Sequence, residues 1–331
     1  MLKRRVSRIV LIRGALALAV CTASAGCSRR DVSVAAAAPT DHGLTEGTIV
    51  FDGNSLLGSR EGQESVSDAL KKIVRPGPAV VWANVAGDGS ATEELTAHAP
   101  DVVDPFSYPG GGANVCVIWE GSNDLYKGAG VEGSLLHLRN YVRARKAAGW
   151  TVVVLTLIPR GWPTLPQGWE TERTALNAAL RSTPIGYDRL VDAGADSQIG
   201  PADAWKNLRF FLPDGVHLTS AGGRHIAELM APTVRDLFGA TPGRRISESQ
   251  ASVTCGNQRE IDANVVMACA VRSPGTPVQF AWSFSDGAAG VTTMPVIHHN
   301  FARGHETSVQ VTMTMSGGER FRAFTKVALG K

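Results

Sequence analysis

The chain has 331 residues, of which 19% are charged and 44% are hydrophobic, so it can bury a large core and is not a disordered protein. At about 150 residues per domain, this length indicates two domains. The formal net charge is +3, but residues 1–26 hold five basic residues and no acidic one, so the remainder carries −2. Basic patches interleaved with aromatic residues are not found in the sequence, and we expect no nucleic-acid partner.

Residues 1–26 have the organisation of a secretory signal. Basic residues come first, the short apolar run 14–23 follows, and small residues end the segment. Arg13 divides the apolar stretch into pieces shorter than the roughly 20 residues of a membrane-spanning helix. We therefore expect a cleaved signal, an extracytoplasmic protein, and a flexible tether over residues 27–46.

Two cleavage sites are compatible with this segment. Ala23-Ser24-Ala25 fits the small-residue site of ordinary signal peptidase. Ser24-Ala25-Gly26-Cys27 resembles a bacterial lipoprotein box, in which Cys27 receives the lipid. The mature protein is then either secreted or periplasmic, or it is held at a membrane through lipidated Cys27 alone.

From residue 47 to residue 239, short apolar runs alternate with helical patterns. The runs are rich in β-branched residues and almost continuously apolar, as in strands buried on both faces of a parallel sheet. They cover residues 48–51, 79–84, 114–119, 151–158 and 189–192. Helical spacing is found at Leu135, Leu138, Tyr141 and Val142, and over residues 174–181 and 220–238. This alternation predicts an α/β domain, in which ligands bind at the carboxyl ends of the strands.

The pattern changes after residue 239. Residues 240–250 are rich in Pro, Gly, Arg and Ser and form the predicted linker. Residues 251–331 contain strand-like runs at 265–271, 278–284 and 308–315, separated by turn signals. A small β-sandwich is expected. Within it, Cys255 and Cys269 are expected to form a disulfide, because an exported protein meets oxidising conditions. Cys116, in an apolar run, is expected to be a buried thiol.

Residues with a hydroxyl, an amide or an accessible backbone N–H follow several of the predicted strands. Ser55 comes after the first, Gly87 and Gly89 lie in the loop after the second, and Asn123 follows the third. Asp214 precedes His217 by three residues, a spacing that lets the carboxylate hold the imidazole from within one turn. Together these residue types could activate a serine and stabilise an oxyanion.

These four blocks, in this order, resemble the SGNH (GDSL-type) hydrolase family over about residues 48–238. The resemblance implies a flavodoxin-like, three-layer α/β/α fold with no cofactor and no metal. It also implies Ser55 as nucleophile, Asp214 and His217 as the rest of a triad, and an oxyanion hole of the Ser55 N–H, Gly89 and Asn123. Gly87 is a second choice for the glycine donor. The first block departs from the family pattern, because Asn54 stands where an Asp is usual.

Two further groups of residues have side chains suited to binding. Trp162 and Trp169 flank a Pro- and Gly-rich loop after the fourth strand, and they are expected at the rim of a substrate cleft, where tryptophan can stack on a sugar. Packing on the domain surface is the alternative for both. His298, His299 and His305 lack partners at metal-ligand spacing, so solvated strand-edge histidines are expected instead.

The C-terminal region has a resemblance of its own. Residues 280–287 read Phe-Ala-Trp-Ser-Phe-Ser-Asp-Gly and are followed by His299-Asn300-Phe301. These landmarks are similar to those of the PKD-type Ig-like module. The resemblance implies that Trp282 and Phe284 point into an Ig-like core, and that the module serves as a spacer or binds carbohydrate.

The sequence therefore predicts an exported serine esterase. The expected substrate is a short acyl ester, such as acetyl, on a polysaccharide. Two alternatives remain open: a lipase or phospholipase, and a non-catalytic envelope or adhesion protein that uses the scaffold to bind a glycan or a protein.

Overall fold

The computed structural model describes residues 44, 46–58, 60–77, 79–108, 112–183, 185–239, 251–261, 264–273, 277–302 and 306–328. The predicted signal, Cys27, nearly all of the tether and the linker 240–250 lie outside these residues, as does His305. Within the described part, no helix is long and apolar enough to cross a membrane.

The first part of the described chain is built on a five-stranded parallel sheet with the order β2-β1-β3-β4-β5. Its strands are β1 (Glu46–Gly53), β2 (Ala79–Asn84), β3 (Ala113–Trp119), β4 (Thr151–Leu155) and β5 (Arg189–Val191). In β3 and β4, side chains on both faces are buried, which explains their continuous apolar sequence. The predicted parallel sheet is confirmed.

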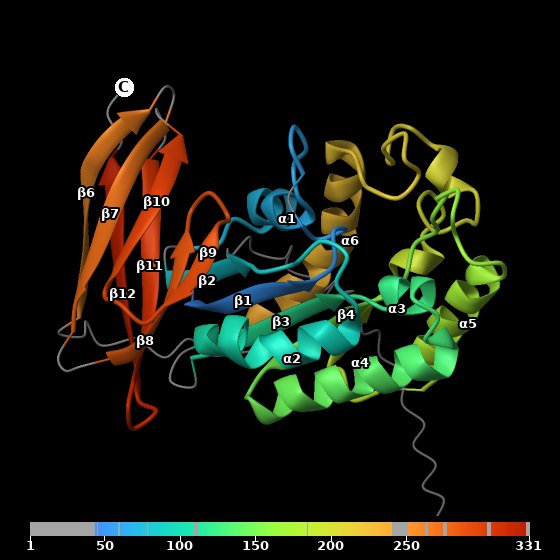
Figure 1. Cartoon of the computed structure of the whole chain (residues 1–331), viewed down its shortest axis with the longest axis horizontal. Helices are drawn as coiled ribbons and strands as arrows, with labels where there is room; N and C mark the ends of the chain where they lie inside the picture. Colours follow the sequence, from blue (N-terminus) through green and yellow to red (C-terminus); the bar gives the residue numbers. More distant parts are fainter. Residues whose placement is uncertain are drawn as a thin grey trace, which may run out of the picture. The chain divides into compact units, whose positions relative to one another are not determined.

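Six α-helices of the described chain accompany this sheet. They are α1 (Val66–Val74), α2 (Thr92–Val102), α3 (Ser122–Tyr126), α4 (Gly130–Ala147), α5 (Trp169–Ser182) and α6 (Ser220–Gly239). Helix α1 packs against α6, and α4 packs against both α2 and α5. In Figure 1, α2 and α4 lie in front of the sheet and α6 lies behind it, so the three layers are α/β/α.

The fourth strand is shorter than the predicted 151–158. Residues 156–158 remain buried, but the backbone of Leu157 bonds to helix α5 instead of to a neighbouring strand. The Leu157 N–H donates to Asn177 Oδ1 at 2.7 Å, and the Leu157 carbonyl accepts from Arg173 and from Asn177. Because helix side chains satisfy the backbone here, burial continues past the end of the β-ladder.

The second part of the chain consists of two antiparallel sheets. One has the order β10-β7-β6 and the other β12-β11-β8-β9. The strands are β6 (Ser252–Ile261), β7 (Asn264–Arg272), β8 (Pro277–Phe284), β9 (Ala289–Thr292), β10 (Val296–Ala302), β11 (Glu306–Met315) and β12 (Arg320–Ala328). Trp282 and Phe284 of β8 are buried in a core with Met267 and Phe301, which come from the other sheet.

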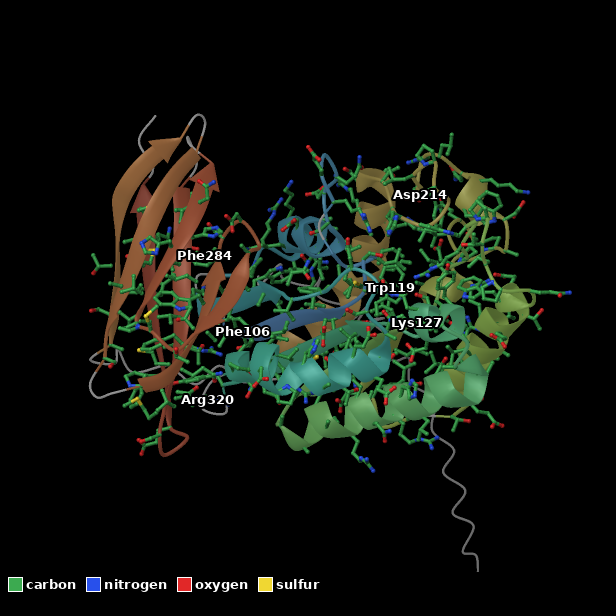
Figure 2. The ribbon with its side chains drawn as sticks, viewed as in Figure 1. Phe106, Trp119, Lys127, Asp214, Phe284 and Arg320 are labelled. Carbon is green, nitrogen blue, oxygen red and sulfur yellow. A yellow bond between two sulfur atoms is a disulfide. The ribbon has the colours of Figure 1, made fainter. Side chains whose placement is uncertain are left out.

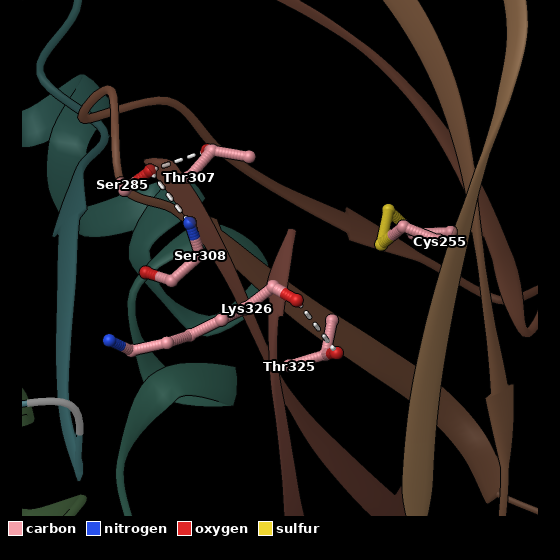
Figure 3. The surroundings of a disulfide bond; sticks show 7 residues. Cys255, Ser285, Thr307, Ser308, Thr325 and Lys326 are labelled. Carbon is pink, nitrogen blue, oxygen red and sulfur yellow. Dashed lines mark hydrogen bonds between the residues drawn. A yellow bond between two sulfur atoms is a disulfide. The ribbon is translucent and has the colours of Figure 1, made fainter. Parts of the chain in front are cut away.

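Cysteine chemistry differs between the two parts. Cys255 of β6 and Cys269 of β7 are cross-strand partners joined by a disulfide, and Figure 3 shows the bond beside the neighbouring strands. Cys116 in β3 is fully buried, and burial raises the pKa of its thiol to about 12. A protonated thiol without access to solvent is a core residue and not a nucleophile.

The antiparallel sheets also contact the α/β part directly. Ser283 Oγ donates to the carbonyl of Trp82 in β2 at 2.5 Å, and Lys71 Nζ of α1 donates to the carbonyl of Ser285 at 3.1 Å. The Ser285 hydroxyl in turn pairs with Thr307 and accepts from the Ser308 N–H, as Figure 3 shows. Residues 42–331 accordingly form one compact unit.

Candidate active site

The three strand ends that carry the predicted residues are neighbours in the sheet. Strand β1 lies between β2 and β3, so the loops after Gly53, Asn84 and Trp119 share one edge. Figure 2 labels Trp119, the last residue of β3, and Asp214 in the loop before α6. The parallel topology thus brings together residues that are 68 or more positions apart in sequence, such as Asn54 and Ser122.

Ser55, His217 and Asp214 form a continuous hydrogen-bonded chain. His217 Nε2 lies 3.0 Å from Ser55 Oγ, and His217 Nδ1 lies 2.6 Å from Asp214 Oδ2. Asp214 Oδ1 also accepts the N–H groups of Val216 and His217 at 2.8 and 2.9 Å. An ionised Asp214 holds the proton on Nδ1, which leaves the lone pair of Nε2 facing the serine hydroxyl.

The environment of Asp214 supports this protonation state. Burial alone would raise the pKa of Asp214, but the hydrogen bonds from the His217 ring and from two backbone N–H groups outweigh burial and hold the pKa below its usual value.

The turn between Asp214 and Val216 requires glycine. Gly215 has a φ of +69°, and a Cβ there would meet the Cα of Gly161 at 3.1 Å.

The residues predicted as oxyanion donors line the same pocket. Ser55, Gly89 and Asn123 all line one pocket of about 270 Å³, together with His217. The alternative glycine is already engaged, because the Gly87 N–H donates to the Gly53 carbonyl at 2.9 Å. The Asn123 side-chain amide gives one N–H to the Ser90 carbonyl at 2.8 Å, and its second N–H is available to a ligand.

Asn54 explains the departure from the usual first block. It is fully buried, and its Oδ1 accepts the Leu56 N–H at 2.9 Å. Its Nδ2 donates to Ser122 Oγ at 3.0 Å, whereas an ionised aspartate has no donor and could only accept the Ser122 hydroxyl proton. The amide therefore ties the nucleophile loop to the loop that carries Asn123.

Two arginines of the site were missed by sequence reasoning. Arg160 is buried, and it donates to Asn123 Oδ1 at 3.0 Å and to Ser122 Oγ at 2.6 Å, which orients the Asn123 amide. Arg60 Nη2 lies 2.6 Å from His217 Nε2. Arg160 lies two residues past the predicted end of the fourth strand, at the sheet edge that carries Ser55 and Asn123, and this position was the signal that could have found it. Arg60 follows no strand end closely and belongs to no motif, so no local signal identifies it.

The two tryptophans have different positions. Trp162 is 41% exposed and lines the pocket, as expected for a rim residue. The expectation for Trp169 is wrong, since this residue is only 2% exposed and begins α5. It lies on the buried face of that helix with Arg173 and Leu176, and the guanidinium of Arg160 is 5.9 Å from its ring centroid.

His298 and His299 lie on the edge strand β10, as expected, and His298 is exposed. His299 is not solvated as expected. Its ring stacks on Phe284 at 4.0 Å, and its Nε2 lies 2.6 Å from Asp286 Oδ2. Among the described residues there is no group of three side chains that could hold a metal ion.

A buried carboxyl group lies behind the oxyanion donors. Glu120 is fully buried, and its Oε1 accepts the N–H groups of Gly121 and Asn123, both at 2.9 Å. Burial raises the pKa of Glu120 to about 8. The folded protein therefore holds this carboxyl group protonated at neutral pH, where the unfolded chain would ionise it.

Stability should consequently fall as the pH rises from about 5 to about 8. The contribution of Glu120 is fully present below its ordinary pKa of 4.5 and is lost as the pH rises toward 8 and beyond. Between pH 5 and pH 8 this loss amounts to about 3 kcal/mol. Urea titrations at pH 5 and pH 8 give the free energy of unfolding of the wild type and of Glu120→Gln. Between the two pH values, the free energy should fall by about 3 kcal/mol less in Glu120→Gln than in the wild type. Equal losses in both proteins would contradict the assignment.

Comparison with known proteins identifies the family of the chain. A model of the GDSL-like Lipase/Acylhydrolase family matches residues 44–225, more than half of the chain. The protein therefore belongs to this family of esterases and acylhydrolases. No curated protein matches the chain.

Solved structures with a similar fold include a Clostridium thermocellum family 3 carbohydrate esterase, with 16% identity and a TM-score of 0.45 over 59% of this chain and 100% of that one. A psychrotrophic esterase from Pseudoalteromonas sp. has 14% identity and a TM-score of 0.43, over 58% of this chain and 98% of that one. A GDSL-like lipase from Bacteroides thetaiotaomicron has 18% identity and a TM-score of 0.43, over 57% of this chain and 88% of that one.

Proposed function

We propose that the protein is an exported serine esterase that removes short acyl groups, such as acetyl, from a carbohydrate. The observation that carries this proposal is the hydrogen-bonded chain from Ser55 through His217 to Asp214. Export is supported by the signal-like residues 1–26. The acyl group would enter the pocket of about 270 Å³ that Trp162 and Leu165 help to line.

In the proposed reaction, Ser55 Oγ attacks the ester carbonyl carbon while His217 Nε2 takes the hydroxyl proton. The negative charge on the carbonyl oxygen is held by the N–H groups of Ser55 and Gly89 and by Asn123 Nδ2. His217 then gives its proton to the departing alkoxide, and the acyl group remains on Ser55. Water attacks this ester, His217 takes the water proton, and the carboxylic acid leaves as Ser55 is reprotonated.

The proposal is tested by covalent labelling. A fluorophosphonate should label the folded protein with one adduct, which peptide mass spectrometry should locate on Ser55. Ser55→Ala should not be labelled, whereas Ser182→Ala, which removes an exposed hydroxyl at the end of α5, should be labelled like the wild type. Absence of both labelling and ester turnover in the wild type would support the non-catalytic alternative.

A chain-length series separates the two enzymatic alternatives. Among p-nitrophenyl esters, turnover should be highest for acetate and should fall beyond butyrate. A rate that rises toward octanoate would favour the lipase alternative instead. Release of acetate from acetylated polysaccharides then identifies the acceptor.

A further inference from the structure

The pocket around Ser55 has three cationic side chains in its lining. They are Arg60, Lys127 and Arg160, and the described lining contains no carboxylate. A neutral acetylated sugar would add no anion to the carboxylates that already lie beside Arg60 and Lys127, Asp88 and Glu94. A substrate that carries a negative charge would give these cations a further partner, since guanidinium and ammonium groups are the usual ligands of carboxylates and phosphates.

The three cations are not equally free to meet a ligand. Arg160 is buried and held by Asn123 and Ser122, so it belongs to the oxyanion hole. Lys127 Nζ is paired with Glu94 at 2.9 Å in an exposed position. The side chain of Arg60 is one-third exposed, and its closest carboxylate is the solvent-exposed Asp88 at 3.4 Å. Within the described residues, its buried Nε has no hydrogen-bond partner.

Arg60 also hydrogen-bonds to His217 Nε2, the atom that must act as the base. Its Nη2 lies 2.6 Å from His217 Nε2, while Ser55 Oγ lies 3.0 Å from the same nitrogen. A guanidinium is always protonated and can only donate, so Arg60 and the serine hydroxyl compete for one lone pair. His217 can accept the serine proton efficiently only when Arg60 moves away from Nε2.

We propose that Arg60, assisted by Lys127, selects acylated saccharides that bear an anionic group, a carboxylate or a phosphate, close to the scissile ester. Binding of this group draws Arg60 away from His217 Nε2 and frees the base. Arg60 is thus a specificity-determining residue that couples recognition of charge to activation of the nucleophile. This inference rests on the proposed esterase function.

The test uses three esters that differ only in the group at C6, which is neutral in one and anionic in two. They are methyl glucoside, methyl glucoside 6-phosphate and methyl glucuronoside, each acetylated at O4 so that the anion lies close to the ester, with released acetate as the measured product. The wild type should cleave at least one anionic ester with a kcat/KM about tenfold above that of the neutral ester. The ranking of the uronate and the phosphate identifies which anion the site takes. The preference should weaken as salt is added.

Arg60→Met should remove both the competition for His217 Nε2 and the preference for anionic esters. Turnover of the neutral ester should rise severalfold, because the competing donor is gone, while the preference for the anionic esters disappears. Arg60→Lys should retain part of the preference. Arg189→Gln, which removes an exposed arginine at the start of β5, should behave like the wild type.

Two results would overturn the proposal: a wild type that cleaves the neutral ester as well as both anionic ones, or an Arg60→Met variant that loses activity equally on all three. Either result leaves the esterase function intact as long as turnover depends on Ser55. Failure of the esterase function itself would appear as no Ser55-dependent turnover of any ester, including p-nitrophenyl acetate.

Discussion

Alanine at His217 should lower kcat/KM for p-nitrophenyl acetate by about 10⁶-fold, and alanine at Ser55 should have an effect of the same size. The reason is that the two groups act as one unit, since Ser55 Oγ is a weak nucleophile unless Nε2, 3.0 Å away, accepts its proton. The double variant should be no slower than either single variant. Asp214→Asn should cost about 10⁴-fold, because it no longer fixes the ring tautomer.

These rates are measured on proteins whose melting temperatures match that of the wild type. His225→Ala is not a suitable control, since His225 Nε2 pairs with Asp196. His137→Ala is unsuitable too, because its ring contacts the buried Asp124. Ser182→Ala again serves as the neutral control. If His217→Ala kept more than about a tenth of the wild-type activity, the proposed base would be wrong.

Removal of the Asn123 amide should lower kcat by roughly 10²- to 10³-fold, with little change in KM. The amide N–H that is not bonded to the Ser90 carbonyl is placed to meet charge that develops only in the transition state. Asn140→Ala, on the exposed face of α4, is the matched control and should leave both constants unchanged. A loss confined to KM would show that Asn123 binds the substrate and not the oxyanion.

Arg160 should act through Asn123. Arg160→Met removes the donor to Asn123 Oδ1, so the amide can turn away, and kcat should fall by about 10- to 100-fold. In an Asn123→Ala background the same change should cost much less, because the group that Arg160 positions is absent. Equal losses in both backgrounds would assign Arg160 a separate role.

Site residues that lie in short motifs or just after strands could be predicted from the sequence. Asp214 and His217 are three residues apart, so one turn already brings the carboxylate to the ring, and the pair is visible as a motif. Ser55 and Asn123 directly follow buried strands, and parallel strands place their carboxyl ends at one edge. The same reasoning failed for Trp169, because a tryptophan beside a Pro- and Gly-rich loop looks exposed until the helix that it begins is packed.

The sequence by itself determined the alternating α/β pattern and the parallel sheet, because these depend on local periodicity and on strand composition. The short spacing of Asp214 and His217 marked one pair, and the resemblance to a known family pointed to Ser55 as their partner. Only the tertiary structure decided which donors surround the site. Arg60 reaches His217 across 157 positions, and Arg160 reaches Asn123 across 37. Such contacts depend on how loops from different strands meet in space. An arginine side chain is long and has several rotatable bonds, so the residues next to it in sequence do not predict which group it contacts.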